Sequence, residues 1–256
     1  MARKIVVTSG KGGVGKTTVV CALACYLASR GKDVVLCDAD FGLNNVDVML
    51  GIENAVTFDL VDVIEGRCRA TQALVSHPTY PTLKILTSSH SAPERYVSPQ
   101  ALKVVLDSLA PKFDYIFIDC PAGIDEGFHR AISVADEAII VTTPHISALR
   151  DADKVITLLK SYRLTNVVLV VNKIRGDLLI SGESLTPDEI ANLLRLPLLG
   201  IIPEEYAVYQ GDFSSLHGAL KTLGNNLLLG KTKLYDVTRK YRGFWGSIRK
   251  AVKRSI

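Results

Sequence analysis

Several features are missing from this 256-residue sequence, and each absence excludes a class of protein. The five cysteines form no CxxC pair, and the five histidines stand singly, so no metal cluster is predicted from them. The first residues contain no apolar signal region, and no apolar run is long enough to span a bilayer. Cys21 and Cys25 lie one helical turn apart without a neighbouring His or Asp, which favours core packing over a metal site. We therefore expect a reduced, cytoplasmic protein.

Acidic residues are absent from the end of the chain. After Asp236 the sequence contains only basic charges, seven in number, namely Arg239, Lys240, Arg242, Arg249, Lys250, Lys253 and Arg254. Because the net charge of the whole chain is +4, residues 1–236 carry −3. A mildly acidic body thus precedes a strongly basic tail, and we expect this tail to engage any anionic partner.

The whole chain is 48% hydrophobic and 22% charged, which is typical of a globular protein with a sizeable core. Short β-branched apolar runs predict strands at residues 4–8, 34–37, 83–86, 115–118, 138–142, 167–171 and 198–202. Helical patterns lie between them at residues 17–30, 99–109, 148–162 and 187–194. This alternation predicts an α/β fold, a mainly parallel twisted sheet with helices on both faces, over residues 1–240. Glycines interrupt the periodicity of residues 203–240, the part predicted least well.

A phosphate-binding motif, G-x-x-x-x-G-K-[ST], lies between the first expected strand and the first expected helix. Its glycines allow backbone N–H groups to point at phosphate oxygens, and the helix adds its N-terminal dipole. We expect Lys16 to reach the β- and γ-phosphates and the Thr17 hydroxyl to ligate Mg²⁺; a glycine-rich turn without a ligand is the alternative. The predicted ATP-binding segment comprises Gly10, Lys11, Gly12, Gly13, Val14, Gly15, Lys16, Thr17 and Thr18.

Three carboxylates follow expected strands. Asp38 and Asp40 come directly after the second strand, and Asp119 closes the apolar run at residues 115–118. The carboxyl ends of parallel strands meet at one edge of a sheet, where these acids can face the phosphates. Asp119 is predicted to hold Mg²⁺ through water, as a Walker B carboxylate does. Capping of a turn is the alternative for Asp38 and Asp40.

The segment Asn172-Lys173-Ile174-Arg175 bears on the identity of the base. A guanine-specific site of the N-K-x-D kind needs a carboxylate at its fourth position, and Arg175 stands there instead. ATP is therefore favoured over GTP. The amide of Asn172 suits an adenine edge, although Asn172 could also be a plain strand-end cap.

A second lysine in the loop, Lys11, is not required by the basic motif and could be a solvated charge. With it, the loop K-G-G-V-G-K-T resembles the deviant-Walker-A family, the MinD/ParA P-loop ATPases. The resemblance implies that Lys11 crosses a nucleotide-sandwich homodimer to touch the partner's phosphates, like an arginine finger. It also implies that Asp40 orients the attacking water, that Asp38 lies near Mg²⁺, and that Pro203 and Glu204 flank the base.

Further segments are similar to the septum-site-determining MinD branch of this family, namely residues 40–47, 119–123, 141–144, 149–153 and 199–204. Asn44 departs from the arginine that is usual there. The resemblance implies an ATPase that dimerises with ATP, binds membrane, recruits the division inhibitor MinC, and is released by an activating or topological-specificity protein.

The tail, residues 241–256, has the pattern of an amphipathic helix. Helical spacing gathers its apolar side chains on one stripe and its basic ones largely around the other side, as in helices that lie in a membrane interface. A terminal helix docked on its own domain is the alternative. We expect attachment to anionic lipid on the cytoplasmic face of the cell membrane through Phe244, Trp245, Ile248, Arg249, Lys250, Val252 and Lys253.

Other functions in the same fold class stay open. A DNA-partitioning ATPase would bind DNA nonspecifically through phosphates, which needs no apolar stripe, so no specific nucleic acid is expected. A flagellar-number regulator of the same family could share both the ATP site and the tail. A reductase of the iron-protein kind would need cluster cysteines, and Cys120 has no convincing partner.

Overall fold

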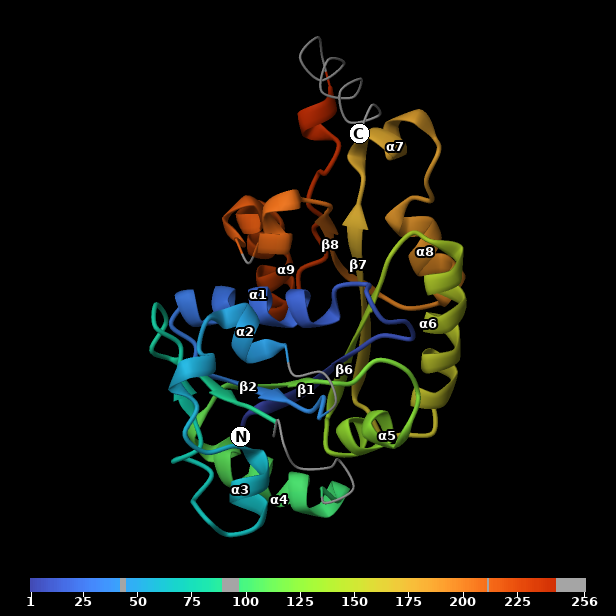
Figure 1. Cartoon of the computed structure of the whole chain (residues 1–256). Coiled ribbons are helices and arrows are strands. Elements are labelled where there is room, and N and C mark those ends of the chain that lie inside the picture. The colour runs from blue at the N-terminus through green and yellow to red at the C-terminus, as the bar shows by residue number, and fades with distance from the viewer. Residues whose placement is uncertain (42–44, 89–96, 211, 243–256) are drawn as a thin grey trace.

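The fold is centred on one twisted sheet, seen in a computed structural model that describes residues 1–41, 45–88, 97–210 and 212–242. Its strands run in the order β3-β4-β2-β5-β1-β6-β7-β8 (Figure 1). All neighbouring pairs are parallel apart from β3, which is antiparallel to β4. The strands are β1 (Arg3–Thr8), β2 (Val34–Asp38), β3 (Val75–Ser76), β4 (Leu83–Leu86), β5 (Tyr115–Asp119), β6 (Glu137–Thr142), β7 (Asn166–Ile174) and β8 (Leu198–Pro203).

The expected mainly parallel sheet is thereby confirmed, together with its seven expected strands. The central strands β2 and β5 are buried along their whole length, as their continuous apolar runs predict for a sheet covered on both faces. The eighth strand, β3, was not predicted, because its two residues are partly exposed and too few to show a period.

Helices cover both faces of the sheet (Figure 1). One core cluster joins the sheet to α1 (Lys16–Ser29), α2 (Val46–Leu50) and α9 (His217–Leu229). The second core cluster, on the other face, joins it to α3 (Leu60–Ile64), α4 (Pro99–Leu109), α5 (Glu126–Ser133), α6 (Ile146–Leu159) and α8 (Pro187–Leu194). Cys21 and Cys25 are buried on α1, within the first cluster. The four expected helices correspond to α1, α4, α6 and α8.

Helix α9 lies in the segment that was predicted least well. Its interior Gly224 faces the ring of Tyr26 on α1, and a Cβ at this position would lie 2.3 Å from two ring carbons. The glycine therefore allows α9 and α1 to approach closely, at the cost of helix propensity. The packing partner is nearly two hundred positions away in sequence, so local periodicity could not reveal the helix.

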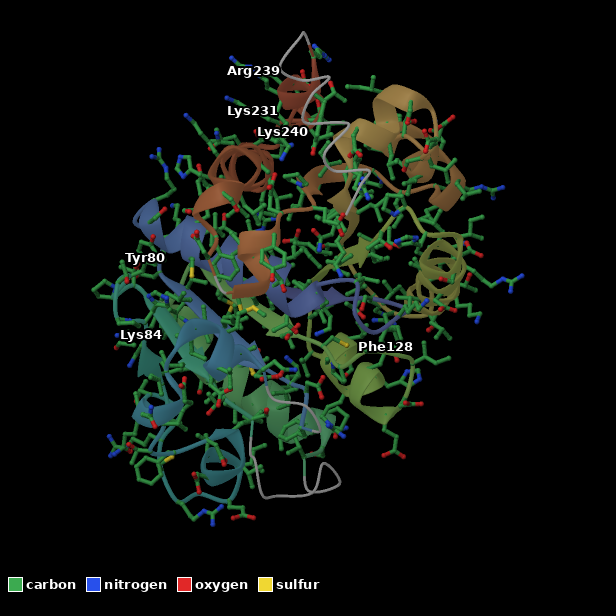
Figure 2. The ribbon with its side chains drawn as sticks, turned by 45° about the horizontal axis from the view of Figure 1, so that its top comes forward. Tyr80, Lys84, Phe128, Lys231, Arg239 and Lys240 are labelled. Carbon is green, nitrogen blue, oxygen red and sulfur yellow. The ribbon has the colours of Figure 1, made fainter. Side chains whose placement is uncertain are left out.

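The described chain ends at Arg242, next to the carboxyl end of β7 and the short helix α7 (Gly176–Ser181) (Figure 1). Tyr241 is buried there, close to Gly176, while Arg239 and Lys240 lie at the same end of the molecule (Figure 2). The predicted membrane-binding residues 244–253 lie outside the described residues. Within residues 1–41, 45–88, 97–210 and 212–242, no helix is long and apolar enough to cross a membrane.

Candidate nucleotide-binding site

The phosphate-binding loop occupies the turn between β1 and α1. Gly13 and Gly15 have φ angles of +78° and +88°, in the left-handed region that favours glycine. Gly15 is the residue before α1, so the loop ends at the N-terminus of a 14-residue helix. Lys11, Gly12 and Gly13 are exposed, whereas Val14 is buried and fixes the loop to the core. This geometry places backbone N–H groups and a helix dipole where an anion can bind.

Lys16 and Thr17, the first residues of α1, both contact Asp119 at the end of β5. Lys16 Nζ lies 2.5 Å from Asp119 Oδ1, and Thr17 Oγ1 donates to Asp119 Oδ2 at 2.7 Å. Both charged side chains of this ion pair are almost fully buried. Burial lowers the pKa of Lys16, but the charge and hydrogen bond of Asp119 outweigh burial and raise it, so the ammonium stays charged. A buried cation is thus held at the start of the helix that follows the loop.

Asp38 lies beside Asp119, because β2 and β5 are neighbours and these two residues are register partners. Burial, and then the charge of Asp119, raise the pKa of the Asp38 carboxyl well above its usual range. Burial likewise raises the pKa of Asp119, against the lowering effect of Lys16. Asp38 Oδ1 accepts a hydrogen bond from the Asp40 backbone N–H at 2.9 Å, which fixes the turn carrying Asp40. Asp38, Asp119 and Lys16 therefore lie together in a buried site at the carboxyl ends of β2 and β5.

The oxygen donors at this site fit a Mg²⁺ ion that is also bound by phosphates. Thr17, Asp38 and Asp119 offer one hydroxyl and two carboxylates, and Mg²⁺ prefers oxygen ligands. In the described part of the chain no group of three His, Cys, Asp or Glu side chains is placed to hold a metal ion alone. A group of three protein ligands is not needed, because Mg²⁺ bound to a nucleotide commonly keeps several waters and uses one or two carboxylates. The residues present therefore match a magnesium–nucleotide site.

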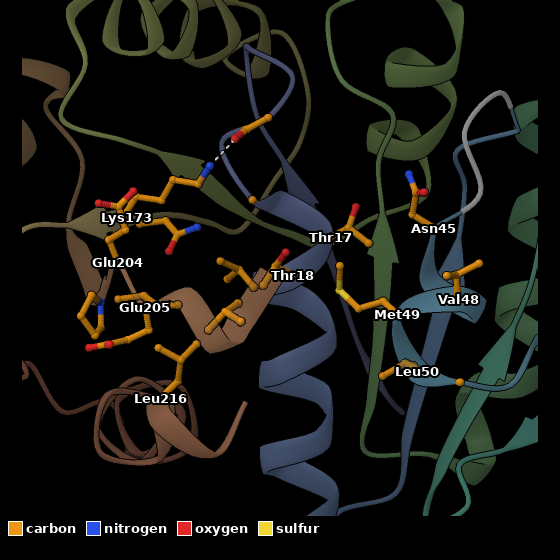
Figure 3. A pocket seen from close by; sticks show the side chains of 18 residues that line it. Thr17, Thr18, Asn45, Val48, Met49, Leu50, Lys173, Glu204, Glu205 and Leu216 are labelled. Atoms are coloured by element: carbon orange, nitrogen blue, oxygen red, sulfur yellow. Dashed lines mark hydrogen bonds between the residues drawn. The ribbon is translucent and has the colours of Figure 1, made fainter. Parts of the chain in front are cut away.

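A pocket of about 820 Å³ opens next to the loop (Figure 3). Parts of the chain that are distant in sequence form its walls: the loop and α1, α2, the end of β7 and the end of β8. The predicted residues that line it are Gly13, Gly15, Thr17, Thr18, Asn172, Pro203 and Glu204. Its other lining residues are Val19, Asn45, Val48, Met49, Leu50, Gly51, Lys173, Ile202, Glu205, Val208 and Leu216.

The side chain of Asn172 has a fixed orientation in this pocket. Its Nδ2 donates to the Val14 carbonyl at 2.9 Å, so its Oδ1 remains as an acceptor. Adenine carries an N6 amino donor where guanine carries the O6 acceptor, and an amide oxygen therefore suits adenine. The nearest carboxylate that follows this strand, that of Asp177, is buried, paired with Arg175 at 2.7 Å, and absent from the pocket lining.

Lys11 lies apart from the buried Lys16, on the surface of the loop. Its Nζ donates to Ser147 Oγ at the start of α6, at a distance of 2.8 Å. Ser147 was missed by sequence reasoning, as was Lys173, whose Nζ donates to the Gly13 carbonyl at 2.8 Å (Figure 3). The adjacency of Lys173 to Asn172 was the one available signal. Asn44, the departure from the family pattern, lies outside the described residues.

Comparison with known proteins places this site in a family. A family model described as an AAA domain matches residues 2–171. The chain is 46% identical over 220 residues to the septum site-determining protein MinD of Bacillus subtilis (strain 168), covering 85% of this chain and 81% of that protein.

Solved structures agree with this similarity. MinD in the MinC:MinD cell division complex of Aquifex aeolicus superposes with a TM-score of 0.82 at 36% identity, covering 91% of this chain and 97% of that one. MinD from Pyrococcus horikoshii OT3, complexed with Mg-ADP, superposes with a TM-score of 0.79 at 30% identity, covering 89% and 96%. The chain therefore belongs to the MinD family of septum-site-determining P-loop ATPases.

Proposed function

We propose that this protein hydrolyses ATP, dimerises when ATP is bound, and attaches to the cytoplasmic face of the cell membrane through residues 241–256, so that it regulates where the cell divides. One observation carries the proposal: the motif that contains the buried Lys16 also presents a second, exposed lysine, Lys11. A single phosphate site needs only Lys16. Lys11 donates one of its three N–H groups to Ser147, so its exposed ammonium keeps donors for another molecule.

The chain's own groups supply the chemistry of ATP hydrolysis. Loop N–H groups and the Lys16 ammonium bind the phosphates, and Asn172 Oδ1 accepts from the adenine edge. Asp40, at the end of the turn fixed by Asp38, orients the attacking water. Thr17, Asp38 and Asp119 hold Mg²⁺, which neutralises charge on the phosphates when bound. ATP rather than GTP is the substrate, because the carboxylate required by guanine is replaced by Arg175.

Lys11 acts across the dimer. Its ammonium is exposed and lies at the surface of the loop, where the phosphates of a facing protomer can approach. Positive charge supplied in trans is effective in phosphoryl transfer and is worth about 10³–10⁵ in rate in enzymes that use an arginine finger. ATP binding, dimerisation and hydrolysis are thereby coupled through one side chain.

The basic tail converts dimerisation into membrane attachment. Each Lys or Arg near an anionic surface contributes about 1 kcal/mol, alongside insertion of Trp245 and Ile248. A single short helix binds weakly, whereas two on one dimer gain about 10²-fold or more in avidity. The Aquifex aeolicus relative forms a complex with MinC, and we propose a MinC-type division inhibitor as partner here, with an activating or topological-specificity protein that ends the cycle.

Co-sedimentation with vesicles tests the proposal. The full chain is mixed with phosphatidylglycerol/phosphatidylcholine vesicles in Mg·ATP or Mg·ADP, with a truncation after Arg242 as the matched control. Pelleting in ATP but not ADP, lost on truncation, supports membrane attachment. ATP-dependent binding to duplex DNA without pelleting would instead favour a partitioning ATPase.

A further inference from the structure

Two consecutive residues of β7 bind backbone carbonyls of the phosphate-binding loop. Asn172 Nδ2 donates to the Val14 carbonyl at 2.9 Å. Lys173 Nζ donates to the Gly13 carbonyl at 2.8 Å (Figure 3). A Cβ on Gly15 would lie 2.4 Å from Asn172 Nδ2 and 3.9 Å from Lys173 Cε. Both side chains therefore pack along the same stretch of loop backbone.

This arrangement is unusual for a strand, in which successive side chains point to opposite sides. Lys173 has a φ of +56°, one of two non-glycine residues with positive φ among those described. The pairing of β7 with β8 also shifts register between Val171 and Ile174, so β7 contains one more residue than its partner there. The bulge and the left-handed backbone turn Lys173 towards the loop. Lysine is disfavoured in this conformation, so the contact offsets a local backbone cost.

The bonds from Asn172 and Lys173 to the loop carbonyls also fix the direction of the loop N–H groups, because the peptide bond is planar. In a trans peptide the carbonyl of one residue and the N–H of the next point in opposite directions. Holding the Gly13 and Val14 carbonyls towards the two β7 side chains therefore directs the N–H groups of Val14 and Gly15 away from those side chains. Backbone N–H groups held in a fixed direction are the donors that a phosphate-binding loop needs.

We infer that Lys173 is a positioning residue for nucleotide binding, which orders the phosphate-binding loop through the Gly13 carbonyl without touching the nucleotide's reacting atoms. The inference rests on the nucleotide site of the proposed function. ATP and ADP share the phosphates that contact the loop, so loss of the lysine weakens both by a similar factor. A residue that served only stability would lower the melting temperature and leave the affinity of the folded protein unchanged.

Isothermal titration of the full chain with Mg·ADP and, in short titrations, Mg·ATP tests the inference. Lys173→Met keeps the length of the side chain but removes the donor, and we expect about tenfold weaker binding of both nucleotides. Lys173→Arg restores a donor and is expected to recover most of the affinity. Lys173→Gly removes the donor while relieving the positive φ, so it should bind as poorly as Lys173→Met with an equal or higher melting temperature than the parent.

Lys84→Met is the matched control, since Lys84 Nζ donates to Ser76 Oγ at 2.6 Å near the opposite edge of the sheet (Figure 2). It should bind nucleotide like the parent. The inference is overturned if Lys173→Met binds both nucleotides with parental affinity, or if Lys173→Arg is as defective as Lys173→Met. It is also overturned if Lys173→Gly binds like the parent. A parent protein that binds neither nucleotide would instead refute the nucleotide site itself.

Discussion

Replacing Asp38 with Asn is expected to stabilise the nucleotide-free protein while impairing its site. The Asp38 carboxyl faces Asp119 across neighbouring strands, and its pKa is raised by burial and then by that second carboxylate. Asparagine keeps the Oδ1 acceptor for the Asp40 N–H but removes the charge. The variant therefore separates the effect of the Asp38 charge on stability from the effect of its hydrogen bond.

The magnitude follows from the geometry. Neighbouring strands lie about 4.8 Å apart, and two unit charges at about 5 Å repel by about 3 kcal/mol at an effective dielectric constant of about 20. Lys16, 2.5 Å from Asp119, cancels part of this repulsion. We expect a net gain of about 1–2 kcal/mol, the usual size for a stabilising change. In a chain of this length that gain raises Tm by about 2–8 °C.

The gain should also depend on pH. The folded protein retains a proton on Asp38 that the unfolded chain loses near pH 3.9. The contribution of Asp38 to the stability of the parent is therefore fully present below that pH and is lost as pH rises through the raised folded-state pKa. The advantage of Asp38→Asn over the parent should grow from pH 5 to pH 8.

Thermal unfolding in EDTA without nucleotide measures this effect at each pH. Asp47→Asn is the matched control, since Asp47 is also buried and accepts a backbone hydrogen bond, from Val48 in the first turn of α2. We expect that control to lower Tm, because an acid near a helix N-terminus is stabilising. An Asp38→Asn variant less stable than the parent at pH 8 would refute the reasoning.

Three further predictions concern the loop, the fold and the tail. Lys16→Ala should weaken ATP binding at least ~100-fold in titration calorimetry, because the phosphates lose a direct charged donor; parental affinity would contradict the site. Gly224→Ala should lower the unfolding free energy by about 1–3 kcal/mol, because the new Cβ collides with Tyr26; denaturant titration measures it, and an unchanged midpoint would contradict the close packing. Trp245→Glu with Ile248→Glu should abolish vesicle pelleting with unchanged Tm, whereas lost stability with retained pelleting would favour a docked tail.

Local patterns were sufficient to predict seven of the eight strands and the phosphate-binding loop. Continuous apolar runs identify buried strands without knowledge of their partners, and the loop motif is contiguous. The juxtaposition of Asp38 with Asp119 also follows from sequence, because both close parallel strands and such strands end at one edge.

Long-range geometry explains what could not be predicted. The contact of Gly224 with Tyr26 joins α9 to α1. The same glycine interrupts the helical periodicity by which α9 could be predicted from the sequence. The role of Lys173 depends on a positive φ and a register shift, neither of which has a signature in a lysine flanked by asparagine and isoleucine. Similarly, the bond from Lys11 to Ser147 joins the phosphate-binding loop to the start of α6, which only the folded sheet brings together.

We propose that ATP-bound dimerisation, acting through Lys11, drives membrane attachment. Asp40→Ala should retain ATP because only the water-orienting group is removed, so it provides a long-lived ATP state. Light scattering after size-exclusion chromatography, followed by vesicle pelleting, is then compared between Asp40→Ala and the double variant with Lys11→Ala. We predict a dimer that pellets for the first and a monomer that binds ATP without pelleting for the second. Equal dimerisation and pelleting of both proteins would contradict the account.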